Sequence, residues 1–477
     1  MAMLGRQAGR SWARRLLSSH GPTAGVANDA SPAAFLQYPQ AELSTLKNGV
    51  RVVSETSAKH SGTVLIGIRA GSRDEGPDEH GVANFVNGML LRGSPKLAKG
   101  SLAKEIENIG ATLGVETDRE LTIYYGRVHN KKHVPRLVEI MADTLQHSLE
   151  VEGAVEEERR RQLKRSQNAA QSVSNLVLDR LHEAAYREQV LGRTVVGAEE
   201  QIRGIDLSRL RAFRDAHHTG DRVVVSGTGC ILHDELASLA EKHFSFIPEG
   251  SYSNTAEPVT FIGGETRERQ DDIGKGHFAI GYSTGGLHSP DTVALRYLTT
   301  LLGHYDAAQH DPSLAPLTHF SHSNLITNCT KAGCVDRIVP FNFDYADTGL
   351  WGIYVQGGPF DMNEAAYQVT NEITRLCYEL DDAQVEMARH TIKTEYFTAA
   401  SNGLATADRA AREVLNYGRR IHPAEFVNRV DACETDDILE CSGRLLQDVD
   451  VVVSAYGAVY EFPDYNHVRR RTYWNRY

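Results

Sequence analysis

The chain repeats its own order of strands and helices, and this duplication constrains its fold more than any other feature. A strand, a Gly- and Asp-rich loop and a helix are predicted in "GTVLIGIRAGSRDEGPDEHGVANFVNGML", and again in "GHFAIGYSTGGLHSPDTVALRYLTTLLG". An alternating strand, a turn and a helix follow in both halves, in "ELTIYYGRVHNKKHVPRLVEIMADTL" and "TGLWGIYVQGGPFDMNEAAYQVTNEITRL". Each half has a late apolar strand, "DRVVVSGTG" or "VDVVVSAYG". Matching features lie roughly 210 to 230 residues apart, which is typical of a duplicated domain and too long for a solenoid repeat.

Strands and helices are mixed rather than strictly alternating, so the pattern predicts an α+β fold. We expect two homologous domains, each a mixed β-sheet packed with helices, and 477 residues are enough for both. A polar, Gly-rich stretch separates the halves. The expected divisions are a transit peptide and disordered start at 1–28, an N-terminal domain at 40–247, a linker at 248–276 and a C-terminal domain at 277–477.

The first residues are basic, although the chain as a whole has a net charge of −11. They contain no acid before Asp29, several serines, and four arginines: Arg6, Arg10, Arg14 and Arg15. This composition is typical of a mitochondrial transit peptide, and a basic disordered tail is the alternative. The acidic balance of the rest argues against a nucleic-acid partner. No run approaches the roughly 18 apolar residues of a membrane span, so we expect membrane association only through partners.

The cysteines and histidines form no compact ligand set. The six cysteines include no C-x-x-C pair, so we interpret them as free thiols, with neither a haem attachment motif nor an iron–sulfur set. "SGTGC" lacks the third glycine of a dinucleotide-binding loop and is interpreted as a turn. Proline residues interrupt the stretch "GHYDAAQHDPSLAPLTHFSHS", which we interpret as a loop rather than a metal site. Its candidate ligands are His304, Asp306, His310, Asp311, His319 and His322.

One amphipathic stretch, His80 to Ser94, carries an unusual polar pattern. Its apolar residues recur at helical spacing and predict a single helix: Val82, Phe85, Val86, Met89 and Leu90. Asn84, Asn87 and Gly88 stand at i, i+3 and i+4, the spacing of the H-x-x-E-H motif of inverted zinc peptidases. The stretch therefore has the spacing of a metal motif without its ligands.

This helix and several long segments resemble the pitrilysin-type (inverzincin) metallopeptidase superfamily. The segments are "LKNGVRVVSE", "AGSRDEG", "ENIGATLGVETDRELTIYYGRV", "GHYDAAQ", "FNFDYADTGLWGIYV" and "LNYGRRIHPAEF". The resemblance covers essentially the whole chain after the transit peptide. It is strongest for the mitochondrial branch, which comprises the processing peptidase β subunit and the core proteins of respiratory complex III. The ending "EFPDYNHVRRRTYWNRY" is most similar to a complex III core protein.

The resemblance implies which positions once held zinc. In active members the motif helix supplies two histidine ligands and a glutamate base, and a later helix supplies a glutamate ligand. These roles fall on Asn84, Asn87, Gly88 and Arg165, or on Lys164 if the register is one residue shorter. An amide is a poor zinc ligand and cannot take a proton from water, glycine has no side chain, and a guanidinium repels a dication. We therefore expect no catalytic residues, no metal and no cofactor. The alternative, another set that includes His80, lacks an acid at ligand spacing.

The resemblance implies a structural subunit more than an enzyme. A core subunit would face the mitochondrial matrix at the inner membrane, support assembly of complex III and so serve electron transport. Its partners would be core protein II, of the same fold, together with cytochrome b, the c-type cytochrome and the iron–sulfur subunit with its cleaved presequence. The alternatives are the β subunit of the processing peptidase, which needs the missing zinc set, and a non-catalytic presequence-binding module.

Overall fold

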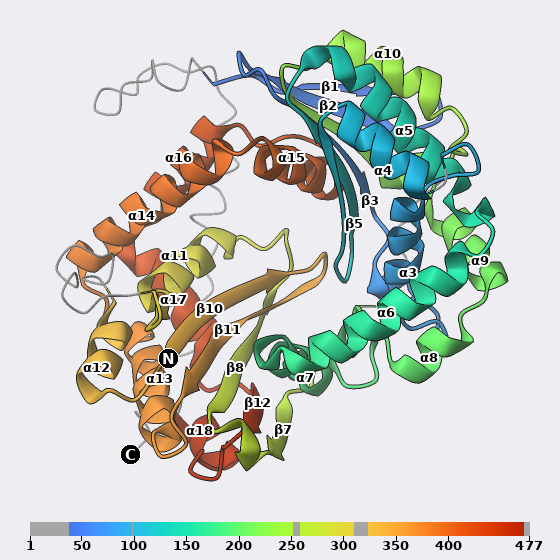
Figure 1. Ribbon diagram of the computed structural model, residues 1–477. Coiled ribbons are helices and arrows are strands. Elements are labelled where there is room, and N and C mark those ends of the chain that lie inside the picture. Colours follow the sequence, from blue (N-terminus) through green and yellow to red (C-terminus); the bar gives the residue numbers. More distant parts are fainter. Residues whose placement is uncertain (1–37, 98, 251–257, 310–322, 472–477) are drawn as a thin grey trace, which may run out of the picture.

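The computed structural model describes residues 38–97, 99–250, 258–309 and 323–471. These residues form two six-stranded sheets, each packed with helices, in two halves joined into a ring-like arrangement (Figure 1). The α+β fold with two homologous domains is therefore confirmed.

The first sheet has the strand order β1-β2-β6-β3-β5-β4. Its strands β2 and β6 run parallel and its other neighbours are antiparallel. The strands are β1 (Glu42–Thr45), β2 (Arg51–Thr56), β3 (Gly62–Ile68), β4 (Ala111–Thr117), β5 (Thr122–Val128) and β6 (Val223–Gly229).

The second sheet has the order β7-β12-β8-β11-β10-β9 and repeats the arrangement of five strands of the first, β2-β6-β3-β5-β4. The sixth strands differ, because β1 lies beside β2 whereas β9 lies beside β10, at the opposite edge. Here too one pair, β7 and β12, is parallel while the rest are antiparallel. The strands are β7 (Gly264–Arg269), β8 (Gly276–Gly285), β9 (Tyr305–Asp306), β10 (Arg337–Asp344), β11 (Thr348–Gly357) and β12 (Val451–Gly457). Strand β7 corresponds to β2, because each pairs in parallel with the last strand of its half, β12 or β6.

Strand β7 lies inside the stretch 248–276 that the sequence predicts to be a linker, and this part of the prediction is wrong. Its sequence "GETRER" is mostly exposed and alternates charges instead of apolar residues. A charged edge strand of this kind resists pairing with other chains, and it leaves no hydrophobic pattern to detect.

The helices of the described residues divide equally between the two halves. Those before β7 are α3 (Val82–Met89), α4 (Lys99–Asn108), α5 (Val134–His147), α6 (Ala154–Gln171), α7 (Val173–Tyr186), α8 (Glu199–Gly204), α9 (Leu207–His217) and α10 (His233–His243). Those after β7 are α11 (Thr292–Leu302), α12 (Asn324–Ala332), α13 (Met362–Leu376), α14 (Asp382–Ala400), α15 (Gly403–Tyr417), α16 (Pro423–Asp431), α17 (Thr435–Leu446) and α18 (Tyr465–Arg471).

One helix of each half packs against the sheet of the other half. Helix α15 packs on β3 and β6 of the first sheet, whereas α7 packs on β8 and β12 of the second (Figure 1). The buried residues that α15 contributes to the first half are Ala407, Ala410, Ala411, Val414 and Leu415. Full burial of one Val or Leu side chain stabilises a fold by about 1.5–3 kcal/mol, so this exchange couples the halves strongly.

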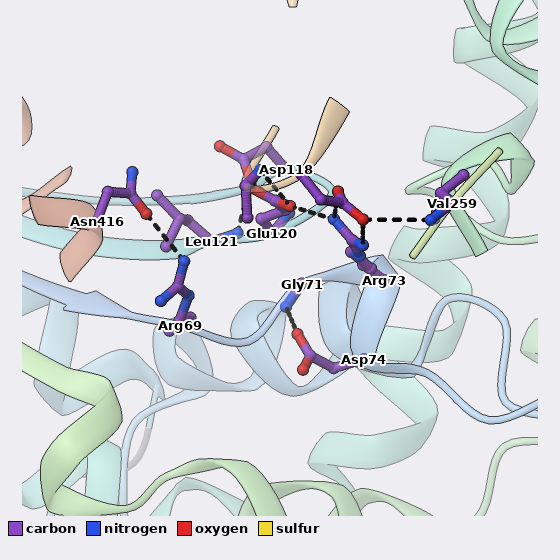
Figure 2. A network of polar contacts seen from close by, with 11 residues as sticks. Arg69, Gly71, Arg73, Asp74, Asp118, Glu120, Leu121, Val259 and Asn416 are labelled. Carbon is purple, nitrogen blue, oxygen red and sulfur yellow. Dashed lines mark hydrogen bonds and ion pairs between the residues drawn. The ribbon is translucent and has the colours of Figure 1, made fainter. Parts of the chain in front are cut away.

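A polar network ties the halves together at a second point (Figure 2). Arg73 donates hydrogen bonds to Glu120 at 2.6 Å and to both carboxylate oxygens of Asp347 at 2.7 Å. Asp347 also accepts from the backbone N–H of Val259, and Glu120 accepts from that of Ala346. Carboxylates from both halves therefore share one guanidinium.

Three sequence features lie outside the described residues. They are the arginine-rich start, the histidines and aspartate at 310–322, and the last six residues. Two candidate ligands of the histidine-rich stretch are described, His304 and Asp306. His304 is exposed directly before β9, and Asp306 lies in β9 and pairs with Arg337 at 3.7 Å.

Candidate functional site, a peptidase motif filled by polar packing

The motif helix α3 is shorter than the sequence predicts and is completely buried. It runs from Val82 to Met89, and a 3-10 turn, Leu90–Arg92, completes the stretch before Gly93 at φ 91°. All eight residues of α3 are buried, so its polar side chains must find partners inside the protein.

A distant carboxylate caps the start of α3. Glu75 accepts hydrogen bonds from the backbone N–H groups of Gly81 at 3.0 Å and Ala83 at 2.9 Å. Gly81 has a φ of 92°, a conformation that favours glycine. Burial raises the pKa of Glu75 to about 8, since desolvation disfavours its charged form. The cap holds α3 in place without presenting a free catalytic acid.

Asn84 and Arg165, which occupy ligand positions according to the resemblance, are in contact. An Nη of Arg165 donates to the side-chain oxygen of Asn84 at 3.2 Å, and the amide nitrogen of Asn84 donates to Gln162 at 2.8 Å. Asn84 is only 3% exposed. Both polar atoms of its amide therefore bind side chains of α6, and a positive charge lies beside it.

The absence of a side chain at Gly88 allows α6 to approach α3 closely. A Cβ atom at Gly88 would overlap the carboxylate of Glu158 and would lie 2.8 Å from the amide nitrogen of Gln162. Glu158 is 0% exposed, and Arg92 binds it from two nitrogens at 2.7 and 2.6 Å. Gln162 donates to the same carboxylate at 2.6 Å.

Asn87 joins the motif helix to the outer strand β4. Its amide nitrogen donates to the backbone carbonyl of Glu116 at 2.9 Å and to the hydroxyl of Thr117 at 2.6 Å. Its oxygen is buried without a partner among the described residues. A neutral amide held in this way cannot accept a proton from water as a general base.

These residues do not fit a zinc ion. No side chain at Gly88 can be a ligand, the amide of Asn84 is already engaged, and Arg165 adds a positive charge. Within the described ranges, no group of three or more His, Cys, Asp or Glu side chains is arranged to hold a metal. The motif positions therefore contribute to packing between α3, α6 and β4.

Sequence reasoning missed three members of the site: Arg92, Glu158 and Gln162. Glu158 and Gln162 are spaced i, i+4 and so share a face of α6, which was the available signal. That signal does not say which helix the face meets. Of the two candidate registers for the last ligand, the described structure joins Arg165 to Asn84 by a hydrogen bond, and it shows none between Lys164 and Asn84.

His80, the alternative ligand, lines a cavity of about 930 Å³ beside the motif. The cavity is bounded by α7, by the loop 192–198 and by the beginning of β7. Burial lowers the pKa of His80, and nearby Arg193 lowers it further.

No helix in the described ranges is both long and apolar enough to cross a membrane.

Comparisons with known proteins define the class. The model of "Insulinase (Peptidase family M16)" matches residues 51–199, and that of "Peptidase M16 inactive domain" matches residues 204–392. The chain is 32% identical to a probable mitochondrial-processing peptidase subunit beta of Arabidopsis thaliana, covering 94% of this chain and 84% of that one. It is 34% identical to the corresponding subunit of Lentinula edodes, covering 90% and 93%. The chain belongs to peptidase family M16.

Solved structures show the same fold. A chain of complex III2 from Candida albicans, with Inz-5 bound, has a TM-score of 0.80 at 22% identity, covering 90% of this chain and 99% of that chain. A protease from Helicobacter pylori has a TM-score of 0.79 at 18% identity, covering 88% and 100%. The duplicated fold thus occurs both in a protease and in a complex III assembly.

Proposed function

We propose that this chain is a non-catalytic core subunit of mitochondrial ubiquinol–cytochrome c reductase, of the core protein I type. It would face the matrix at the inner membrane and support the assembly and stability of the complex. Its partners would be core protein II, cytochrome b, the c-type cytochrome and the iron–sulfur subunit with its presequence.

One observation supports this proposal most directly. Two positions of the zinc motif hold the amides Asn84 and Asn87, and the buried pair of Arg92 and Glu158 occupies the space beside the third, Gly88. Glu158 lies against Gly88 and is bound by Arg92. This packing requires that position 88 has no side chain, whereas the zinc motif needs its second histidine ligand there. The fold shared with a complex III chain supports a structural role for such a scaffold.

The second candidate is the β subunit of the processing peptidase. The names of the relatives, at 32–34% identity, favour it. The site argues against it, because neither a proton acceptor at Asn87 nor a ligand at Gly88 remains.

Depletion in cells separates the two candidates. A core subunit predicts loss of assembled complex III and of ubiquinol oxidation, while matrix precursors are still processed. Native electrophoresis of detergent-solubilised mitochondria should place the chain in a haem-containing band. Early accumulation of many unprocessed precursors, with complex III intact, would overturn the proposal in favour of the peptidase.

A further inference from the structure

A basic face that is only partly neutralised borders the altered motif. Helix α6 exposes four cations: Arg160, Arg161, Lys164 and Arg165. From Arg159 to its end at Gln171, the helix contains no acid.

The acids that precede this face are already engaged. Glu158 binds Arg92 at 2.6 Å and contacts Arg161 only at 3.4 Å, so its single charge is shared. Glu157 also lies 3.3 Å from Arg92. No acid of the described residues lies within ion-pair distance of Lys164, and Arg165 donates its hydrogen bond to the neutral amide of Asn84.

Like charges on this face repel one another. Arg161 and Arg165 are spaced i, i+4, as are Arg160 and Lys164, and such pairs destabilise a helix. A guanidinium has five N–H donors, and Arg165 uses one of them on Asn84. Donors and charge therefore remain available to a negatively charged ligand at the edge of the motif.

The surface around the basic face of α6 favours a soluble peptide over a lipid as its ligand. None of the exposed large apolar side chains of the described residues lies on α3 or α6, so nothing there anchors an acyl chain. The cations extend over five residue steps, roughly 8 Å along the helix axis, which matches several carboxylates better than one small anion.

We propose that this basic face of α6 is a docking site for an acidic polypeptide segment. Arg165 and Lys164 bind its carboxylates at the edge of the motif, and Arg160 and Arg161 extend the contact. The same charges repel Arg-rich segments from this face of α6. This inference does not rest on membership of complex III, because it concerns only the electrostatics of this chain.

Fluorescence anisotropy of the purified full chain tests the proposal with two labelled peptides. In one Glu alternates with Ser, and in the other Arg alternates with Ser. The acidic peptide should bind, more weakly at high salt, and the basic one should not. The double variant K164Q/R165Q should bind the acidic peptide about tenfold more weakly, since charge-assisted hydrogen bonds are lost.

A matched control removes the same charge elsewhere. The double variant R127Q/K242Q changes exposed residues on β5 and α10, and it should bind the acidic peptide as the unmodified chain does. Equal binding of both peptides, or equal loss in both double variants, overturns the proposal. So does R165Q/K164Q-sensitive binding to phosphatidylserine vesicles without binding to the acidic peptide, because the site would then recognise lipid.

Discussion

At the scale of single residues, Gly88 sets the distance between α3 and α6. Its missing Cβ leaves room for the carboxylate of Glu158 and the amide of Gln162. The motif spacing indicates positions 84 and 88, the family resemblance implies position 165, and the structure joins Asn84 to Arg165 across 81 residues. The replacement partners were not predictable, because no periodicity tells which side chain of α6 enters the space that a ligand has left.

Substitution of Gly88 by Ala should destabilise the chain although alanine favours helices. Overpacking in a well-packed core costs about 1–3 kcal/mol, more than the roughly 1 kcal/mol gained in helix propensity. Urea unfolding measures the change. Gly100→Ala in α4 is the control, since no atom lies within 4 Å of the added Cβ, and it should be neutral or stabilising. A stabilised Gly88→Ala variant would contradict the packing described here.

The buried pair of Arg92 and Glu158 should show strong coupling. Arg92→Met leaves a fully buried carboxylate without its main partner, and such changes cost about 3–5 kcal/mol. The double variant Arg92→Met with Glu158→Leu should recover much of that loss, because no unpaired charge remains. A double-mutant cycle from chemical unfolding checks this, and additive effects of the two substitutions would argue against a direct pair.

At the scale of elements, the cap of α3 should make stability depend on pH. The raised pKa of Glu75, about 8, means that the folded state keeps a proton that the unfolded chain releases near pH 4.5. Stability contributed by this group is therefore fully present below pH 4.5 and is lost as pH rises toward 8. Unfolding free energies across this range should fall more steeply for the unmodified chain than for Glu75→Gln; parallel curves would show that Glu75 does not titrate in this window.

Helices α7 and α15, which pack on the sheet of the opposite half, show a limit of sequence patterns. The patterns predict that the chain consists of two similar halves, but not how the halves pack together. Local sequence patterns predict strands such as β3 and β8, because each contains a short apolar run next to a Gly-rich loop. It cannot assign α7 to the second sheet or α15 to the first, because that choice depends on which apolar face remains uncovered after both sheets form.

A fragment that ends at residue 250 should therefore fail to fold as a stable unit. Without α15, the face of the first sheet that this helix covers would expose buried apolar residues: Val53, Leu65, Ile123 and Val224. The fragment should bind a hydrophobic dye and aggregate, and co-expression with residues 251–477 should restore a soluble pair. Cooperative unfolding of the isolated fragment, with the stability of the whole chain, would mean that α15 is dispensable.

At the scale of the whole molecule, two truncations near the end of the chain distinguish an effect on folding from an effect on assembly with partners. Helix α18 belongs to the core: Val468 is buried, and the hydroxyl of Tyr465 donates to the carbonyl of Val451. The carbonyl of Arg471 accepts from Thr374 of α13, so truncation after Phe462 should destabilise the chain itself. Truncation after Arg471 instead removes six residues rich in aromatics, which are enriched in protein interfaces.

If the chain is a structural subunit, truncation after Arg471 should leave its thermal unfolding unchanged and weaken its incorporation into complex III. Replacement of the six residues by a Gly- and Ser-rich segment of equal length controls for chain length and should give the same defect. Native electrophoresis of mitochondria that carry each variant reports assembly, while unfolding of the purified chain reports stability. Normal assembly of the shortened chain would assign the contacts with partners to surfaces of the folded halves, and a parallel loss of stability would assign the last residues to the fold.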